Sequence, residues 1–192
     1  MKIGVFGGTF NPPHLGHLIV AEHAREQLGL GRVLFVPTAV SPHKQSLDIV
    51  DAHHRLEMLR SAVQGNRAFS VLDIELQRGG VSFTVDTLKE LRRMFPVENL
   101  VLLIGVDNLA EFHLWRDPGA ILDLAEVVAL TRPGFSAEGL DPDLRRRIVV
   151  CQVPAIGIEA RQIRRRVREG RSIRYLVPSA VEAYISSHRL YR

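Results

Sequence analysis

The sequence predicts an α/β protein with a doubly wound parallel sheet that helices cover on both faces. Short apolar runs of strand length alternate along the chain with stretches of helical periodicity, which is the pattern of repeated βαβ units. The chain has 192 residues, of which 46% are hydrophobic and 24% are charged, as expected for one globular domain. We therefore expect residues 1–192 to form a single domain.

Six apolar runs are the predicted strands. They cover residues 2–6, 32–36, 69–72, 100–104, 126–130 and 148–153. Predicted helices lie between them, where apolar residues recur at helical spacing. They cover residues 14–28, which Gly29 ends, and the stripes Leu56, Leu59, Val63 and Val81, Val85, Leu88, Leu91, Phe95. Residues 132–143 are predicted to be a loop, and helices at about 161–169 and 178–187 form a small C-terminal helical portion.

Four segments that follow predicted strands should lie on one rim of the sheet. They are residues 7–17, 37–44 and 105–107 and the stretch after Val153. Ligands of open parallel sheets bind beyond the carboxyl ends of the strands, so this rim is the predicted ligand site.

The segment 7–17 has the features of a phosphate site. Gly7 and Gly8 let the backbone turn sharply and approach a ligand, and Gly16 lets a flat group lie close to the helix. His14 and His17 share one face of the first helical turn, where free N–H groups and the helix dipole favour anions. Each histidine alone would fit an ordinary half-buried residue, and the pair lacks a third ligand for zinc.

Charge and composition bear on whether the protein binds nucleic acid or a membrane. The net charge is +4, and arginines crowd the last quarter of the chain, so a nucleic-acid-binding module is one alternative. Aromatic residues are not interleaved with these arginines, which argues against it. No apolar run approaches the ~18 residues that cross a bilayer, so we expect no membrane partner. The single cysteine, Cys151, predicts a buried thiol and a cytoplasmic protein.

The opening segment resembles the H-x-G-H motif of the nucleotidyltransferase superfamily. Further segments resemble one of its families, the bacterial nicotinate-nucleotide adenylyltransferases, in order and over nearly the whole chain. The matching segments are Gly8-Thr9-Phe10-Asn11-Pro12-Pro13-His14-Leu15-Gly16-His17, Ser41-Pro42-His43-Lys44, Phe83-Thr84-Val85-Asp86-Thr87-Leu88, Gly105-Val106-Asp107 with Trp115, and Ile163-Arg164 with Ser172-Ile173-Arg174-Tyr175-Leu176-Val177-Pro178.

This resemblance implies a Rossmann-like fold and an enzyme of NAD biosynthesis. The implied reaction transfers AMP from ATP to nicotinate mononucleotide, giving nicotinate adenine dinucleotide and pyrophosphate. ATP and nicotinate mononucleotide are the expected partners, Mg²⁺ is expected to arrive with ATP, and no nucleic acid or dedicated metal site is expected. The oligomeric state stays open, a homo-oligomer included. A pantetheine-phosphate adenylyltransferase or a cytidylyltransferase is the alternative within the superfamily.

The resemblance also implies residue roles. The catalytic contacts would come from His14, His17, Lys44 and Arg164. The contacts to ATP and to its ribose and phosphates would come from Gly7, Gly8, Thr9, Phe10, Gly16, Gly105 and Asp107. Thr84 would bind the nicotinate carboxylate at a helix start, and Trp115 would stack on the pyridine ring. By position alone, Thr84 and Asp107 could be helix caps, and Trp115 a core residue.

Two positions depart from the family pattern. Asn11 stands where many members carry aspartate. Glu159, Ala160 and Arg161 stand where members usually carry hydroxyl residues that contact the ATP phosphates. Two interpretations stay open for Arg161. Either it replaces those hydroxyls with a cation on the helix face of Arg164, or it points to solvent or pairs with Glu159.

Overall fold

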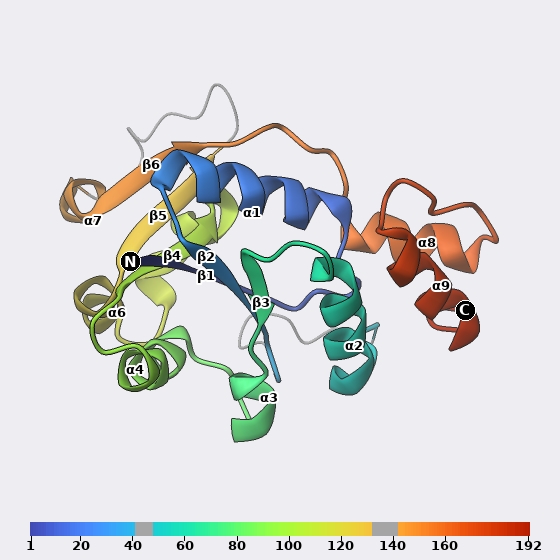
Figure 1. Cartoon of the computed structure of the whole chain (residues 1–192), viewed down its shortest axis with the longest axis horizontal. Coiled ribbons are helices and arrows are strands. Elements are labelled where there is room, and N and C mark those ends of the chain that lie inside the picture. Colours follow the sequence, from blue (N-terminus) through green and yellow to red (C-terminus); the bar gives the residue numbers. More distant parts are fainter. Residues whose placement is uncertain (41–47, 132–141) are drawn as a thin grey trace.

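The computed structural model describes residues 1–40, 48–131 and 142–192. Its centre is a six-stranded sheet in the order β3-β2-β1-β4-β5-β6, with every neighbouring pair parallel (Figure 1). The strands are β1 (Lys2–Gly8), β2 (Arg32–Pro37), β3 (Phe69–Val71), β4 (Asn99–Gly105), β5 (Glu126–Thr131) and β6 (Ile148–Gln152). This is the classic doubly wound order, whose ligand crevice lies where the order reverses, between β1 and β4.

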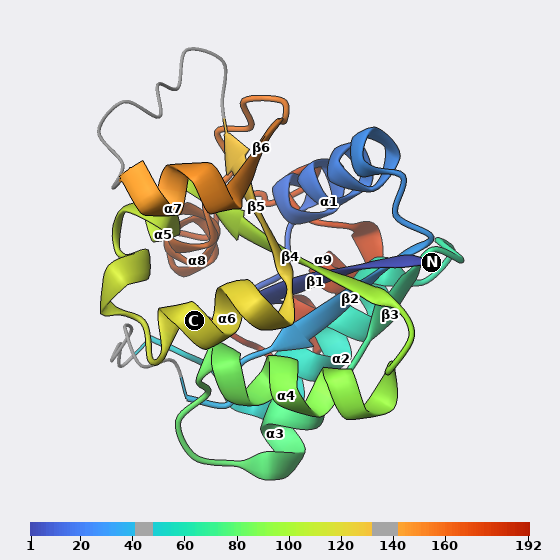
Figure 2. The ribbon, with the colours of Figure 1, turned by 90° about the vertical axis from the view of Figure 1, so that its left-hand side faces the viewer.

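Helices connect the strands and cover both faces of the sheet. They are α1 (Leu15–Leu28), α2 (Ala52–Val63), α3 (Ile74–Arg78), α4 (Thr84–Met94), α5 (Val106–Ala110), the 3₁₀ helix η1 (Phe112–Leu114), α6 (Pro118–Leu124), α7 (Pro142–Arg147), α8 (Ala160–Arg168) and α9 (Ser179–Ser187). Helix α1 covers one face, and α4 and α6 cover the other (Figures 1 and 2). Helices α8 and α9 stand beyond the sheet, beside α2 (Figure 1).

The strands carry apolar side chains on both faces, as their continuous apolar runs predict. Val5 and Leu34 pack in one core with Leu88 of α4. Val33 packs in a second core with Ala21 of α1. A third core joins α2, α8 and α9, so the C-terminal helices are packed onto the sheet domain rather than attached as a tail. Its buried members include Met58, Ile163, Val181 and Ile185.

The predicted strands are confirmed to within two residues at each end, and so are the helices at 14–28 and at the C-terminus. One helix prediction was wrong at its start. Val81 lies outside α4, which begins at Thr84, and it forms an isolated bridge with Val40 and is 44% exposed. The short helices α3, α5, α6 and α7 were not predicted. Of the predicted loop 132–143, Pro142 and Asp143 belong to α7, and residues 132–141 lie outside the described residues.

Cys151 is buried, as predicted, with 2% of its surface exposed, and its thiol donates to Oε1 of Gln27. No helix in the described ranges is both long enough and apolar enough to cross a membrane. The cytoplasmic location and the oligomeric state stay predictions.

Candidate active site

The two motif histidines face each other at the start of α1. His14 is the N-cap residue, in extended backbone, and His17 is the third residue of the helix. Their rings stack with centroids 3.6 Å apart, and the backbone N–H of His14 donates to Nδ1 of His17 over 3.2 Å. Because Nδ1 accepts, a neutral His17 carries its proton on Nε2, which leaves Nε2–H as a hydrogen-bond donor.

His14 is buried at the base of this pair, with 7% of its surface exposed. Burial lowers its pKa to about 4, so the imidazole is neutral at pH 7. Its Nδ1 has no hydrogen-bond partner among the described residues. A Cβ at Gly16 would lie 3.0 Å from that Nδ1 and 3.2 Å from Cγ2 of Ile156, so glycine here makes room for the His14 ring and for Ile156.

A cavity of about 780 Å³ opens in front of the histidines. Two arginines of α8 line it together with His14 and His17. Arg164 donates from Nη1 to the carbonyl of Asn11 over 2.9 Å, and its Nε is buried without a hydrogen-bond partner in the described part of the chain. Arg161 is exposed at the same wall. Two imidazoles and two guanidinium groups give this cavity the chemistry of an anion site.

A second cavity, of about 310 Å³, adjoins the first on the other side of β1. Its walls carry Trp115, whose ring centroid lies 5.4 Å from that of Phe112, and Thr84 at the first position of α4. Arg116 also lines it, with its guanidinium 4.7 Å from the Phe83 ring centroid. A flat ring with a small anionic substituent fits this mixture of aromatic walls, a helix N-terminus and a cation.

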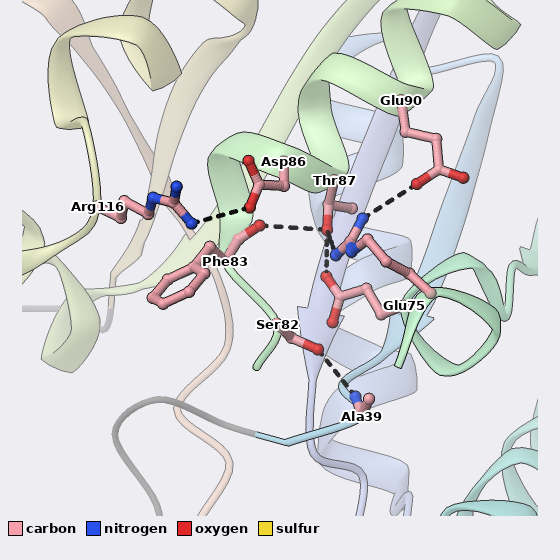
Figure 3. A network of polar contacts seen from close by, with 9 residues as sticks. Ala39, Glu75, Ser82, Phe83, Asp86, Thr87, Glu90 and Arg116 are labelled. Atoms are coloured by element: carbon pink, nitrogen blue, oxygen red, sulfur yellow. Dashed lines mark hydrogen bonds and ion pairs between the residues drawn. The ribbon is translucent and has the colours of Figure 1, made fainter. Parts of the chain in front are cut away.

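A buried polar network holds one wall of the smaller cavity (Figure 3). Glu75 is 5% exposed, and Thr87 donates from its hydroxyl to Oε1 of Glu75 over 2.6 Å. Arg78 donates in turn to Oγ1 of Thr87 and forms an ion pair with Glu90 at 3.0 Å. Burial raises the pKa of Glu75. Asp86 forms an ion pair with Arg116 at 3.3 Å, at the left of Figure 3.

The two cavities share one wall at the carboxyl ends of β1 and β4. The residues that line both are Phe6, Gly7, Gly8, Thr9, Gly105 and Asn108. Five buried polar side-chain atoms of the described residues have no hydrogen-bond partner, and most of them line one cavity or the other. In the described part of the chain, four of these five atoms belong to cavity-lining residues: Nδ1 of His14, Nε of Arg164, Oγ1 of Thr38 and Oε2 of Glu75. Since buried polar groups are normally paired, this concentration marks a place for polar ligands.

The structure brings most of the predicted site residues together. Gly7, Gly8, Thr9, Phe10, His14, Gly16, His17, Gly105 and Arg164 line the larger cavity, and Thr84 and Trp115 line the smaller one. Lys44 lies outside the described residues, and so does the side chain of Asp107.

Both capping alternatives were wrong. The N-cap of α4 is Phe83, so Thr84 is the first helical residue, and the N-cap of α5 is Gly105, so Asp107 lies one residue inside the helix. Sequence reasoning missed Glu75 and Arg116. The only signal for Glu75 was a carboxylate between two apolar residues, Ile74 and Leu76, near the predicted site.

Comparisons with known proteins found a matching family model and similar chains over the full length. The family model for cytidylyltransferase-like proteins matches residues 5–190. A protein of Salinibacter ruber is 43% identical over all of this chain and 98% of its own length, and one of Thermus thermophilus is 45% identical over the full length of both chains. Both carry the name "probable nicotinate-nucleotide adenylyltransferase".

A solved structure shows the same fold. It is the Plasmodium falciparum nicotinic acid mononucleotide adenylyltransferase complexed with NaAD, with a TM-score of 0.79 and 16% identity. The match covers 99% of this chain and 97% of that one.

Proposed function

The chain belongs to the nicotinate-nucleotide adenylyltransferase family, and we propose that it transfers AMP from ATP to nicotinate mononucleotide. The products are nicotinate adenine dinucleotide and pyrophosphate, in a step of NAD biosynthesis. The full-length relatives favour this reaction over the pantetheine-phosphate and cytidylyl alternatives. The solved relative that holds NaAD supports the same substrate pair.

One observation carries the proposal for this chain: two adjoining cavities share a wall, and one is lined by histidines and arginines while the other has aromatic walls. The larger, with His14, His17 and Arg164, suits the triphosphate of ATP. The smaller, with Trp115 and Thr84, suits the pyridine ring and its carboxylate. The phosphate of the mononucleotide then meets the α-phosphorus of ATP at the shared wall.

The chemistry needs positioning more than proton transfer. An oxygen of the mononucleotide phosphate, already ionised at neutral pH, forms a bond to the α-phosphorus. The bond from that phosphorus to the oxygen bridging it to the β-phosphorus breaks, and pyrophosphate leaves. Charge grows on the phosphate oxygens in this step, so fixed donors and cations lower the barrier. We assign this work to Nε2–H of His17, to Arg164 and to the backbone N–H groups of Thr9 and Phe10.

Mg²⁺ enters with ATP in this proposal. Among the described residues, no three His, Cys, Asp or Glu side chains are grouped as metal ligands. Phosphate oxygens are ligands that Mg²⁺ prefers, so the triphosphate can supply its coordination. The ion, when bound, neutralises part of the triphosphate charge.

A substrate panel tests the function. ATP is combined with nicotinate mononucleotide, nicotinamide mononucleotide or phosphopantetheine, and pyrophosphate release is measured. The acid mononucleotide should give the highest kcat/KM, because the N-terminus of α4 at Thr84 favours a carboxylate over a neutral amide. Equal values for acid and amide would reject this specificity. The function would be rejected if pyrophosphate were released with phosphopantetheine and with neither mononucleotide.

A further inference from the structure

The loop between β1 and α1 is held from behind by a buried arginine. Arg55 of α2 is 1% exposed and bonds backbone carbonyls of three segments. It donates to Thr9 over 2.9 Å, to Ala39 over 3.3 Å and to Val50 over 3.3 Å. A buried guanidinium is costly unless its donors are satisfied, so these contacts fix the three segments relative to each other.

Asn11, two residues after Thr9 in this loop, is also held by hydrogen bonds and is 4% exposed. Its Nδ2 donates to the carbonyl of Asp48 over 2.9 Å, and its Oδ1 accepts from the N–H of Val50 and from the hydroxyl of Tyr191. An ionised aspartate has no donor for the Asp48 carbonyl. The asparagine of this chain therefore matches its surroundings.

Tyr191 reaches Asn11 from the end of the chain, 180 residues away in sequence. Its hydroxyl lies 2.9 Å from Oδ1 of Asn11, and burial raises the pKa of the phenol, so it stays a donor. After α9, both Arg189 and Tyr191 adopt left-handed backbone, with φ of 52° and 64°. Such backbone is unfavourable for residues other than glycine and persists where the surroundings hold it.

The loop between β1 and α1 is strained at Phe10, which lies between Thr9 and Asn11. Phe10 has a φ of 47°. The C=O and N–H of a trans peptide point in opposite directions, so a Thr9 carbonyl bonded to Arg55 turns the N–H of Phe10 away from Arg55. Without the contacts to Thr9 and Asn11, this loop would relax from its left-handed conformation.

We propose that Tyr191 is a positioning residue for adenylyl transfer. Its hydroxyl holds Asn11 while Arg55 holds Thr9, and together they fix the donors that the loop presents to the α-phosphate. Tyr191 lines neither cavity in the described structure, and its hydroxyl bonds the loop at Asn11. This inference rests on the proposed function.

The test compares two tyrosines of the C-terminal segment. Tyr191→Phe removes only the hydroxyl that bonds Asn11. Tyr184→Phe removes a hydroxyl that lies 3.0 Å from Nδ1 of His54, away from the loop. Because one buried hydrogen bond is worth ~1 kcal/mol, kcat of Tyr191→Phe should fall roughly fivefold. Both KM values should change less than twofold, since the loop donors act mainly in the transition state. Tyr184→Phe should keep wild-type kcat.

A double-mutant cycle with Asn11→Ala makes the test specific. If Tyr191 acts through Asn11, the double variant should lose no more kcat than Asn11→Ala alone. The proposal is overturned by wild-type kcat in Tyr191→Phe, by an equal loss in Tyr184→Phe, or by multiplicative losses in the double variant. Failure of the proposed function would look different, because the wild-type chain would then release no pyrophosphate from ATP and nicotinate mononucleotide.

Discussion

The two cavities share part of their wall at the carboxyl ends of β1 and β4, yet their other walls carry different side chains. The larger one combines the histidine pair with two arginines, and the N-termini of both α1 and α8 reach it. The smaller one has mostly apolar and aromatic walls, a buried carboxyl group on Glu75 and one partly exposed arginine, Arg116. The histidine pair therefore lies in the larger cavity, and Trp115 lies in the smaller one.

This difference suggests a division of roles, in which one cavity serves the chemical step and the other serves binding of the mononucleotide. The larger cavity should control the chemical step, because its donors are assigned to the phosphates. The smaller one should control the affinity for the mononucleotide. Substitutions in the two cavities should therefore affect different kinetic constants.

The largest expected effect comes from His17→Ala. It removes Nε2–H, the donor assigned to the growing phosphate charge, and loss of one such donor costs roughly 100- to 1,000-fold in kcat. Kinetics with ATP and nicotinate mononucleotide measure it, with circular dichroism to show that the variant is folded. His23→Ala, an exposed position of the same helix, is the control and should keep wild-type kcat. Near-normal kcat in folded His17→Ala would contradict the assignment.

The second prediction concerns His14 and the pH dependence of stability. Burial lowers the pKa of His14 from 6.5 to about 4, so between these values the unfolded chain binds more protons than the folded one. The contribution to the free energy of unfolding is complete above pH 6.5 and lost as the pH falls towards 4. It amounts to about 3 kcal/mol, and His14→Asn should abolish this part of the slope.

Urea unfolding at several pH values between 7 and 4 measures the slope. His23→Asn removes an exposed histidine of the same helix and should leave it unchanged. A wild-type slope in His14→Asn would show that burial does not hold this imidazole neutral.

The third prediction concerns Trp115 in the smaller cavity. Trp115→Ala removes the ring assigned to stack on the pyridine, and ring stacking of this kind contributes ~1–3 kcal/mol. The KM for nicotinate mononucleotide should rise roughly 10- to 100-fold, while the KM for ATP stays within twofold. Trp115→Phe keeps an aromatic ring and should be affected less. An equal rise in both KM values would break the division between the cavities.

The sequence predicted the parts of this molecule that depend on local patterns. The strands were correct because each is an apolar run, and His14 and His17 were found because their spacing and the glycines before them are local. The start of α4 was wrong because Val81 fits the helical spacing, although Gly79 and Gly80, both at positive φ, hold it outside the helix.

Residues whose role depends on distant partners escaped prediction. Glu75 bonds a threonine 12 residues away, Arg55 a carbonyl 46 residues away and Tyr191 an amide oxygen 180 residues away. No spacing rule links such pairs, because the fold alone brings them together. The same reason explains why the sequence did not show the role of Asn11, whose side chain bonds Asp48, Val50 and Tyr191.

The smallest expected effect tests the departure of α8 from the family pattern. Arg161 lines the larger cavity near the N-terminus of α8, three residues before Arg164. No ion pair joins it to Glu159 in the part of the chain that the structure describes, so its charge is available to a ligand there. It is exposed, and water screens its charge, so Arg161→Ala should raise the KM for ATP only about two- to fivefold. The KM for the mononucleotide should not change.

Arg165→Ala gives the matched control, because Arg165 is an exposed arginine of the same helix that lines neither cavity. Both variants lose one positive charge, so a general effect of net charge on ATP binding would appear in both. A specific contact would appear only in Arg161→Ala, and it should weaken as the salt concentration rises. If Arg161→Ala binds ATP as the wild type does, Arg161 makes no contact with the ATP phosphates. The phosphates would then depend on Arg164 and the histidine pair in the described part of this cavity.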